Sequence, residues 1–209
     1  TTLTTGLLAV TLTVSAGITV SGDATLAATA GKTAATNAYT SSGGTGSITY
    51  SATGTNAEIT FSPATQIVSV ATTASAGTYD LVITATDANG ATGTTSLTVT
   101  VSAAIVVSGA TTLATTSGVA TATAAYTATG GTGSLTYSAT GTTADITFDP
   151  STRIVSVSSS ATTGATVVIT ATDTLGATGV KTLVVTVNAA IVVSGSSTLD
   201  ATAGTVKNS

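Results

Sequence analysis

Apolar and polar residues alternate along most of this chain, in short runs that are separated by turn-forming residues. The segments "TYDLVITATD" and "SLTVTV" show this most clearly, and a period of two is that of a β-strand with one buried face. Threonine fills many of the polar positions, because it keeps the β-branched shape of valine while presenting a hydroxyl to water. The residues expected to face inward are Tyr79, Leu81, Ile83, Ala85, Leu97, Val99 and Val101, and Ser96, Thr98 and Thr100 are expected to face outward.

Turn signals recur every ~8–12 residues, a spacing that is typical of a β-sandwich. They divide the first half of the chain into seven predicted strands, at 18–27, 33–41, 46–53, 57–62, 66–72, 78–87 and 95–103. The "GGTG" segments at 43–46 and 130–133 lack the Lys and Ser or Thr of a phosphate-binding loop. We expect both to be hairpin turns that require positive φ.

The sequence of residues 18–104 recurs, with substitutions, at residues 105–190. The block "GGTGSITYSATGTNAEITFSPATQIVSV" of the first copy corresponds to "GGTGSLTYSATGTTADITFDPSTRIVSV" of the second. Gly22, Gly109 and Gly195 hold the same position in successive copies, at spacings of 87 and 86 residues. A repeat of this length has the size of one small sandwich domain. We therefore predict an all-β fold of two tandem seven-stranded Greek-key sandwiches, over 18–104 and 105–190.

Further pieces of the repeat lie at both ends of the sequence. Residues 6–18 match 93–105, so residues 1–17 are predicted to form an orphan strand equivalent to the last strand of a repeat. Residues 191–209 are predicted to supply the first strand of a third, partial repeat. Orphan strands expose unpaired backbone groups and tend to add to the sheets of other molecules. The linker "VTVSAAIVVSG" has no Pro, and no Gly before its last residue, which predicts a stiff connection.

Four segments of the second copy carry a family resemblance: "YTATGGTGSLTYSATG", "ITFDPSTRIVSV", "VVITATDTLGATG" and "TLVVTV". Together they resemble the bacterial putative-immunoglobulin and cadherin-like tandem repeats of large cell-surface proteins and filaments. The chain departs from that pattern in lacking a "GTP-T" turn after the Phe-Pro segment. The resemblance implies immunoglobulin-like sandwiches, and a role in the stalks of adhesins or in surface filaments.

Composition narrows the possible functions. Charged residues make up 6% of the chain, the net charge is −4, and the four basic residues are scattered. Nucleic acids and anionic membrane surfaces attract clustered Lys and Arg, so neither is an expected partner. The sequence has no apolar run long enough to span a membrane. A surface rich in Thr and Ser and poor in charge resembles the secreted surface proteins of microbes, so we expect an extracellular location.

Aspartates at strand ends are the sharpest candidates for a binding site. The candidate residues are Asp87, Asn89 and Glu58 in the first copy and Asp173 and Asp145 in the second, where Leu175 replaces Asn89. Such oxygens could hold calcium, which takes six to eight oxygen ligands and which cadherin-like domains bind between domains. Alternatively, Asp87 and Asp173 accept hydrogen bonds from the backbone of the turn that follows each strand. No other cofactor or metal site is expected.

Catalytic residues are not predicted. The chain has no His and no Cys, which excludes the usual triads, and its acidic residues are spread thinly. Lys32 and Lys181 do not align between the copies, so no shared Lys–Asn crosslink is expected. The leading hypothesis is a structural subunit of an extracellular fibre that joins copies of itself head to tail through its terminal strands. The alternative is a stalk segment of a long repetitive adhesin whose binding head lies elsewhere.

Overall fold

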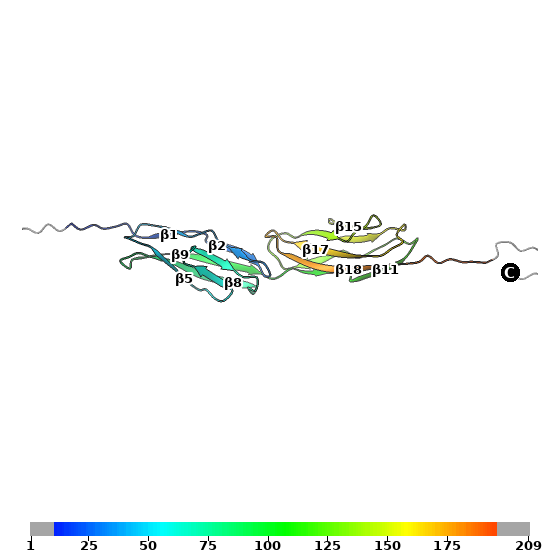
Figure 1. Ribbon diagram of the computed structural model, residues 1–209, viewed down its shortest axis with the longest axis horizontal. Helices are drawn as coiled ribbons and strands as arrows, with labels where there is room; N and C mark the ends of the chain where they lie inside the picture. The colour runs from blue at the N-terminus through cyan, green and yellow to red at the C-terminus, as the bar shows by residue number, and fades with distance from the viewer. Residues whose placement is uncertain (1–10, 196–209) are drawn as a thin grey trace, which may run out of the picture. The chain divides into compact units, whose positions relative to one another are not determined.

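The computed structural model describes residues 11–195, and within that range the chain forms strands, turns and loops without any helix (Figure 1). This confirms the all-β prediction. By spatial contacts the described chain divides into two compact units. The first unit holds residues 11–106, 128–136 and 171–179, and the second holds residues 107–127, 137–170 and 180–195. The boundaries drawn from the sequence repeat stay a prediction, and residues 1–10 and 196–209 of the predicted end strands lie outside the described residues.

The first half of the chain folds into a sandwich of short strands. The strands are β1 (Thr19–Ser21), β2 (Thr25–Thr29), β3 (Ala34–Ala35), β4 (Thr40–Ser42), β5 (Thr49–Thr53), β6 (Ile59–Ser62), β7 (Ile67–Val70), β8 (Gly77–Thr86) and β9 (Thr92–Ser102). One sheet has the strand order β2-β9-β8-β5 and another has the order β3-β7-β6, while β1 and β4 form a short pair. The seven predicted strands are all present, but two of them are each divided into two parts.

The first predicted strand is divided because the chain changes sheets at Gly22. β1 pairs with β4, whereas β2 runs parallel to β9, with Thr25 opposite Thr98. A Cβ on Gly22 would lie 2.2 Å from Cδ1 of Tyr39, so only glycine lets the chain pass this buried ring. The hydroxyl of Tyr39 donates to the carbonyl oxygen of Asp23 (2.7 Å) and holds the crossing in place.

The "GGTG" segments have the predicted backbone conformation but not the predicted role. Gly43, Gly44 and Gly46 have φ angles of 81°, 77° and 77°. However, β4 pairs with β1 while β5 pairs with β8, so the loop between them connects two different sheets. The hairpin prediction is therefore wrong, because a local turn pattern specifies the backbone bend but not which strands become partners.

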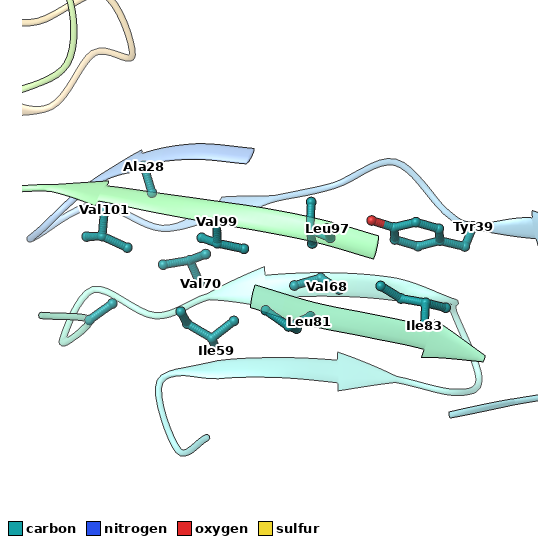
Figure 2. Packing of buried hydrophobic residues seen from close by; sticks show 11 residues of the cluster. Ala28, Tyr39, Ile59, Val68, Val70, Leu81, Ile83, Leu97, Val99 and Val101 are labelled. Carbon is teal, nitrogen blue, oxygen red and sulfur yellow. The ribbon is translucent and has the colours of Figure 1, made fainter. Parts of the chain in front are cut away.

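The core lies between the sheets and contains the residues that the alternation pattern placed inside. Figure 2 shows Leu81 and Ile83 of β8 and Leu97 and Val99 of β9 among the buried cluster, each no more than 1% exposed. Tyr79 is only half-buried, and its hydroxyl donates to the carbonyl oxygen of Ser75 (3.0 Å). Burying side chains of this size stabilises the fold by about 1.5–3 kcal/mol each.

The second half repeats this arrangement. Its strands are β10 (Val106–Ser108), β11 (Thr112–Thr116), β12 (Thr121–Ala122), β13 (Thr127–Thr129), β14 (Thr136–Thr140), β15 (Ile146–Asp149), β16 (Ile154–Val157), β17 (Ala165–Thr172) and β18 (Thr178–Asn188). The sheet orders are β11-β18-β17-β14, β12-β16-β15 and β10-β13. β11 runs parallel to β18, as β2 does to β9. The repeated sequence therefore produces a repeated pairing of strands.

Candidate functional site

Asp87 follows the end of β8 and ties two loops together. Its Oδ1 accepts hydrogen bonds from the backbone N–H groups of Asn89 and Ala91 (both 2.9 Å), which closes the turn after the strand. Its Oδ2 accepts a hydrogen bond from the backbone N–H of Thr45 (2.9 Å), inside the "GGTG" loop. The turn-binding alternative is thus confirmed for Asp87, and the contact with the glycine loop is an addition to it.

Asp173 has the same bonds at the matching position. Its Oδ1 accepts from the backbone N–H groups of Leu175 (2.9 Å) and Ala177 (2.8 Å), and its Oδ2 accepts from that of Thr132 (2.9 Å). Because position 175 contributes only its backbone N–H, the exchange of Asn for Leu there leaves the arrangement intact. One bond is new, since the hydroxyl of Thr29 also donates to Asp173 Oδ2 (2.6 Å).

Both carboxylates are almost buried and both are stabilised in the ionised form. Asp87 is 7% exposed and Asp173 is 6% exposed. The pKa of Asp87 is lowered mostly by the N–H of Thr45; burial opposes this effect, the N–H groups of the following turn add to it, and the net shift is downward. Burial raises the pKa of Asp173, but the hydroxyl of Thr29 and the backbone N–H groups together lower it by more, so the net shift is downward.

These surroundings differ from those that a calcium ion requires. The oxygens of Asp87 face N–H donors, whereas a cation would have to replace those donors by further oxygens. Glu58 is not brought to Asp87: the register of β5 on β8 places Thr53 opposite Val82, so the chain after β5 continues beside the far end of β8. Among residues 11–195 no three acidic, His or Cys side chains lie close enough to hold a metal ion.

Other sequence candidates also have structural partners. Asp145 accepts hydrogen bonds from the hydroxyls of Ser158 (2.9 Å) and Ser160 (2.5 Å), which lower its pKa. The ammonium group of Lys32 donates to the carbonyl oxygen of Leu175. These contacts stabilise turns and loops.

Asp87, the turn after β8 and the "GGTG" loop at 43–46 together form what we call the Asp87 loop cluster. The chain segment that precedes the first sandwich also contacts this cluster. The hydroxyl of Thr45 donates to that of Ser15 (2.8 Å), and the backbone N–H of Gly44 donates to the carbonyl oxygen of Ala16 (2.9 Å). A cavity of about 290 Å³ remains beside these contacts. It is lined by Thr13, Val14, Ser15, Thr45, Asp87 and Asn89, among others.

Sequence reasoning missed the hydroxyl groups of these clusters. Thr132 is hydrogen-bonded to Ser102 (3.0 Å between hydroxyl oxygens), as Thr45 is to Ser15. The signal was present, because a threonine occupies the third position of both "GGTG" segments and a serine recurs at both matching linker positions. Thr29 could not be found in this way, since its partner Asp173 is 144 residues away in the sequence.

Comparisons with known proteins extend only to the fold. No protein-family model and no curated protein matches the chain. Among solved structures it is similar to Drosophila N-cadherin EC1-4 (12% identity, 78% of this chain and 48% of that one, TM-score 0.35). It is also similar to Drosophila OTK extracellular domains 3-5 (10% identity, 81% of this chain and 62% of that one, TM-score 0.45). A third similar structure is the titin I-band fragment I67-I69 (10% identity, 83% of this chain and 66% of that one, TM-score 0.47).

The chain spans between 48% and 66% of the length of these structures. At identities of 10–12% and TM-scores of 0.35–0.47, these likenesses carry no statement about function. Within residues 11–195 there is also no helix of the length and hydropathy that crossing a membrane would need.

Proposed function

We propose that this chain is a structural segment of an extracellular fibre, in which copies join head to tail through strands at their ends. The observation that carries the proposal is that one sandwich occurs twice with the same interior and the same aspartate-centred loop cluster. In both copies the carboxylate is engaged by backbone N–H groups of its own loops. The repeated feature is thus a carboxylate that fixes two loops through their backbone N–H groups. Such a feature suits a structural element better than a catalyst.

The exposed sheet faces support an extracellular, mechanical role. On the outer face of β8 and β9 the cross-strand pairs include Thr84 with Thr94, Thr86 with Thr92, and Thr78 with Thr100. Threonine favours the strand conformation and keeps the surface hydrated without charge. In this proposal the chain has no enzymatic activity and its partners are further copies of itself.

Electron microscopy of negatively stained native material tests the proposal. We expect filaments whose axial repeat is on the order of two sandwich domains in length. Dispersed particles without filaments, at every protein concentration tried, would overturn it. The mass per unit length, compared with the mass of the intact subunit, then shows how many chains lie side by side in the filament.

A stalk segment of a long surface adhesin is the second candidate. It is favoured by the sequence matches that continue beyond the two sandwiches, at residues 6–18 and from residue 191 onward. An intact mass far above 19.7 kDa, with many such repeats in one polypeptide, would favour this candidate over a polymer of separate subunits. The two candidates share a structural role and differ in whether successive sandwiches are covalently connected.

A further inference from the structure

The segment before the first sandwich carries an apolar face that lacks a partner within the described residues. Leu12 and Val14 are 83% and 82% exposed. In the sequence repeat they match Val99 and Val101 of β9, which are 0% and 3% exposed. Those two valines lie opposite Leu26 and Ala28 of β2 and point into the core. Residues 11–15 therefore have the inward-facing side chains of a last strand without the sandwich that such a strand completes.

A second observation lies at the Asp87 loop cluster. At the matching cluster, Asp173 Oδ2 accepts a hydrogen bond from the hydroxyl of Thr29, the last residue of β2, which pairs with Ser102. The hydroxyls of Ser15 and Thr45 repeat the contact of Ser102 with Thr132, but beside Asp87 there is a cavity of about 290 Å³. Asp87 thus has every partner that Asp173 has except the threonine hydroxyl.

Both clusters fit the incoming chain equally closely. A Cβ on Gly43 would lie 2.2 Å from the carbonyl oxygen of Gly17, and one on Gly130 would lie 2.2 Å from that of Ala104. Such contacts leave no room for any side chain, so each glycine loop packs directly against the backbone of the segment that leads into its sandwich. The first cluster is consequently built in the same way as the second, down to the backbone of the linker.

We propose that residues 11–15 are the last strand of another sandwich of this kind, and that the cavity beside Asp87 receives the threonine that ends its second strand. The partner is a second copy of strands β10–β17, placed in series before this chain. In that copy the threonine is Thr116, the residue that matches Thr29 and pairs with Asn188 at the end of β11. This inference rests on the proposed structural function and names the surface that continues the series.

The test is an extended protein in which a second copy of residues 105–177 is placed directly before Thr5 of the chain. Thr5 matches Thr178 in the repeat, so the junction keeps the register of the last strand. We expect the backbone amides of residues 12–15 to exchange with solvent at least about 100-fold more slowly than in the original chain, since they now belong to a sheet. Unchanged exchange in the extended protein would overturn the inference.

One substitution, made in both proteins, separates a specific fit from a merely longer protein. Leu12→Asp should shift the melting temperature of the original chain by less than about 2 °C, because the side chain is exposed there. In the extended protein the same variant should abolish the protection of residues 12–15. Protection that survives Leu12→Asp would show that the strand is not the one we assign.

The hydroxyl contact is tested by Thr116→Val in the added copy, combined with Asp87→Asn. If Thr116 donates to Asp87, the two substitutions should be non-additive in the melting temperature of the extended protein. Strict additivity would overturn the assignment of the cavity. Because these measurements use a covalently extended chain, they can fail while filaments are observed, or succeed while none are, so they are distinct from the test of the proposed function.

Discussion

The hydrogen bond from Thr29 to Asp173 offers the sharpest test of the structure. The hydroxyl oxygen lies 2.6 Å from Asp173 Oδ2 and 2.9 Å from the hydroxyl oxygen of Thr132, and Thr29 is only 2% exposed. Thr29→Val removes the hydroxyl while keeping the β-branched shape that suits a strand. Hydrogen bonds to charged groups contribute more than neutral ones, so we expect a loss of about 1–3 kcal/mol in the free energy of unfolding.

The assay is urea unfolding of the full chain, monitored by circular dichroism. With a slope of about 2 kcal/mol per molar urea, a loss of about 2 kcal/mol moves the midpoint by about 1 M. Thr100→Val is the matched control, because Thr100 is an exposed residue of the neighbouring β9 and its replacement should change stability by less than about 0.5 kcal/mol. Equal midpoints for the two variants would refute the assigned role of Thr29.

The same bond predicts a dependence on pH with a definite sign. The folded-state pKa of Asp173 lies below its unfolded value, so its ionised form contributes stability above about pH 4. That contribution is lost as the pH falls through the lowered folded-state pKa. The difference between the original chain and Thr29→Val should therefore shrink on acidification, and a difference that grows at low pH would contradict the reasoning.

Three further predictions concern stability. Gly22→Ala should lower the free energy of unfolding in urea by about 1–3 kcal/mol, because the added Cβ meets the ring of Tyr39. Gly17→Ala is the control and should be neutral, because a Cβ there has nothing within 4 Å; equal effects of the two variants would contradict the prediction. Leu97→Ala should cost about 2–5 kcal/mol by calorimetry, against little change for the exposed Leu12→Ala. Acid titration should destabilise the protein only below about pH 4, and a loss beginning near neutrality would contradict the lowered carboxyl pKa values. The carboxyls concerned are Asp87, Asp145, Asp149 and Asp173.

The sequence predicts well those features that depend on local alternation. The inward positions of β8 and β9 follow from a period of two, because a strand that buries one face must place apolar residues at every second position. Tyr79 also packs against the core, but it stays half-buried because its hydroxyl reaches the carbonyl oxygen of Ser75 at the surface. The repeat also predicts correctly that both halves share one pattern of strand pairing.

Features that depend on distant partners could not be predicted. The change of sheet at Gly22 follows from the ring of Tyr39, and nothing in "VSGDATL" indicates that contact. The prediction that the "GGTG" loops are hairpin turns is wrong for the same reason, since the bend is local whereas the strand partners are not. The contact of Thr29 with Asp173 joins residues from different copies, so the repeat alone cannot reveal it.

The parallel pairing of the second and last strands determines how each sandwich responds to tension. In β2 and β9 five residue pairs run from Thr25 opposite Thr98 to Thr29 opposite Ser102. The chain enters at the Thr25 end of this ladder and leaves beyond Ser102 at the other end, so a pull on both ends slides the two strands along each other. All the hydrogen bonds of the ladder are then strained together, whereas a hairpin pulled apart at its open end loses them one at a time. The pairing of β11 with β18 has the same geometry, which places a shear-resistant element between entry and exit in both halves of the chain.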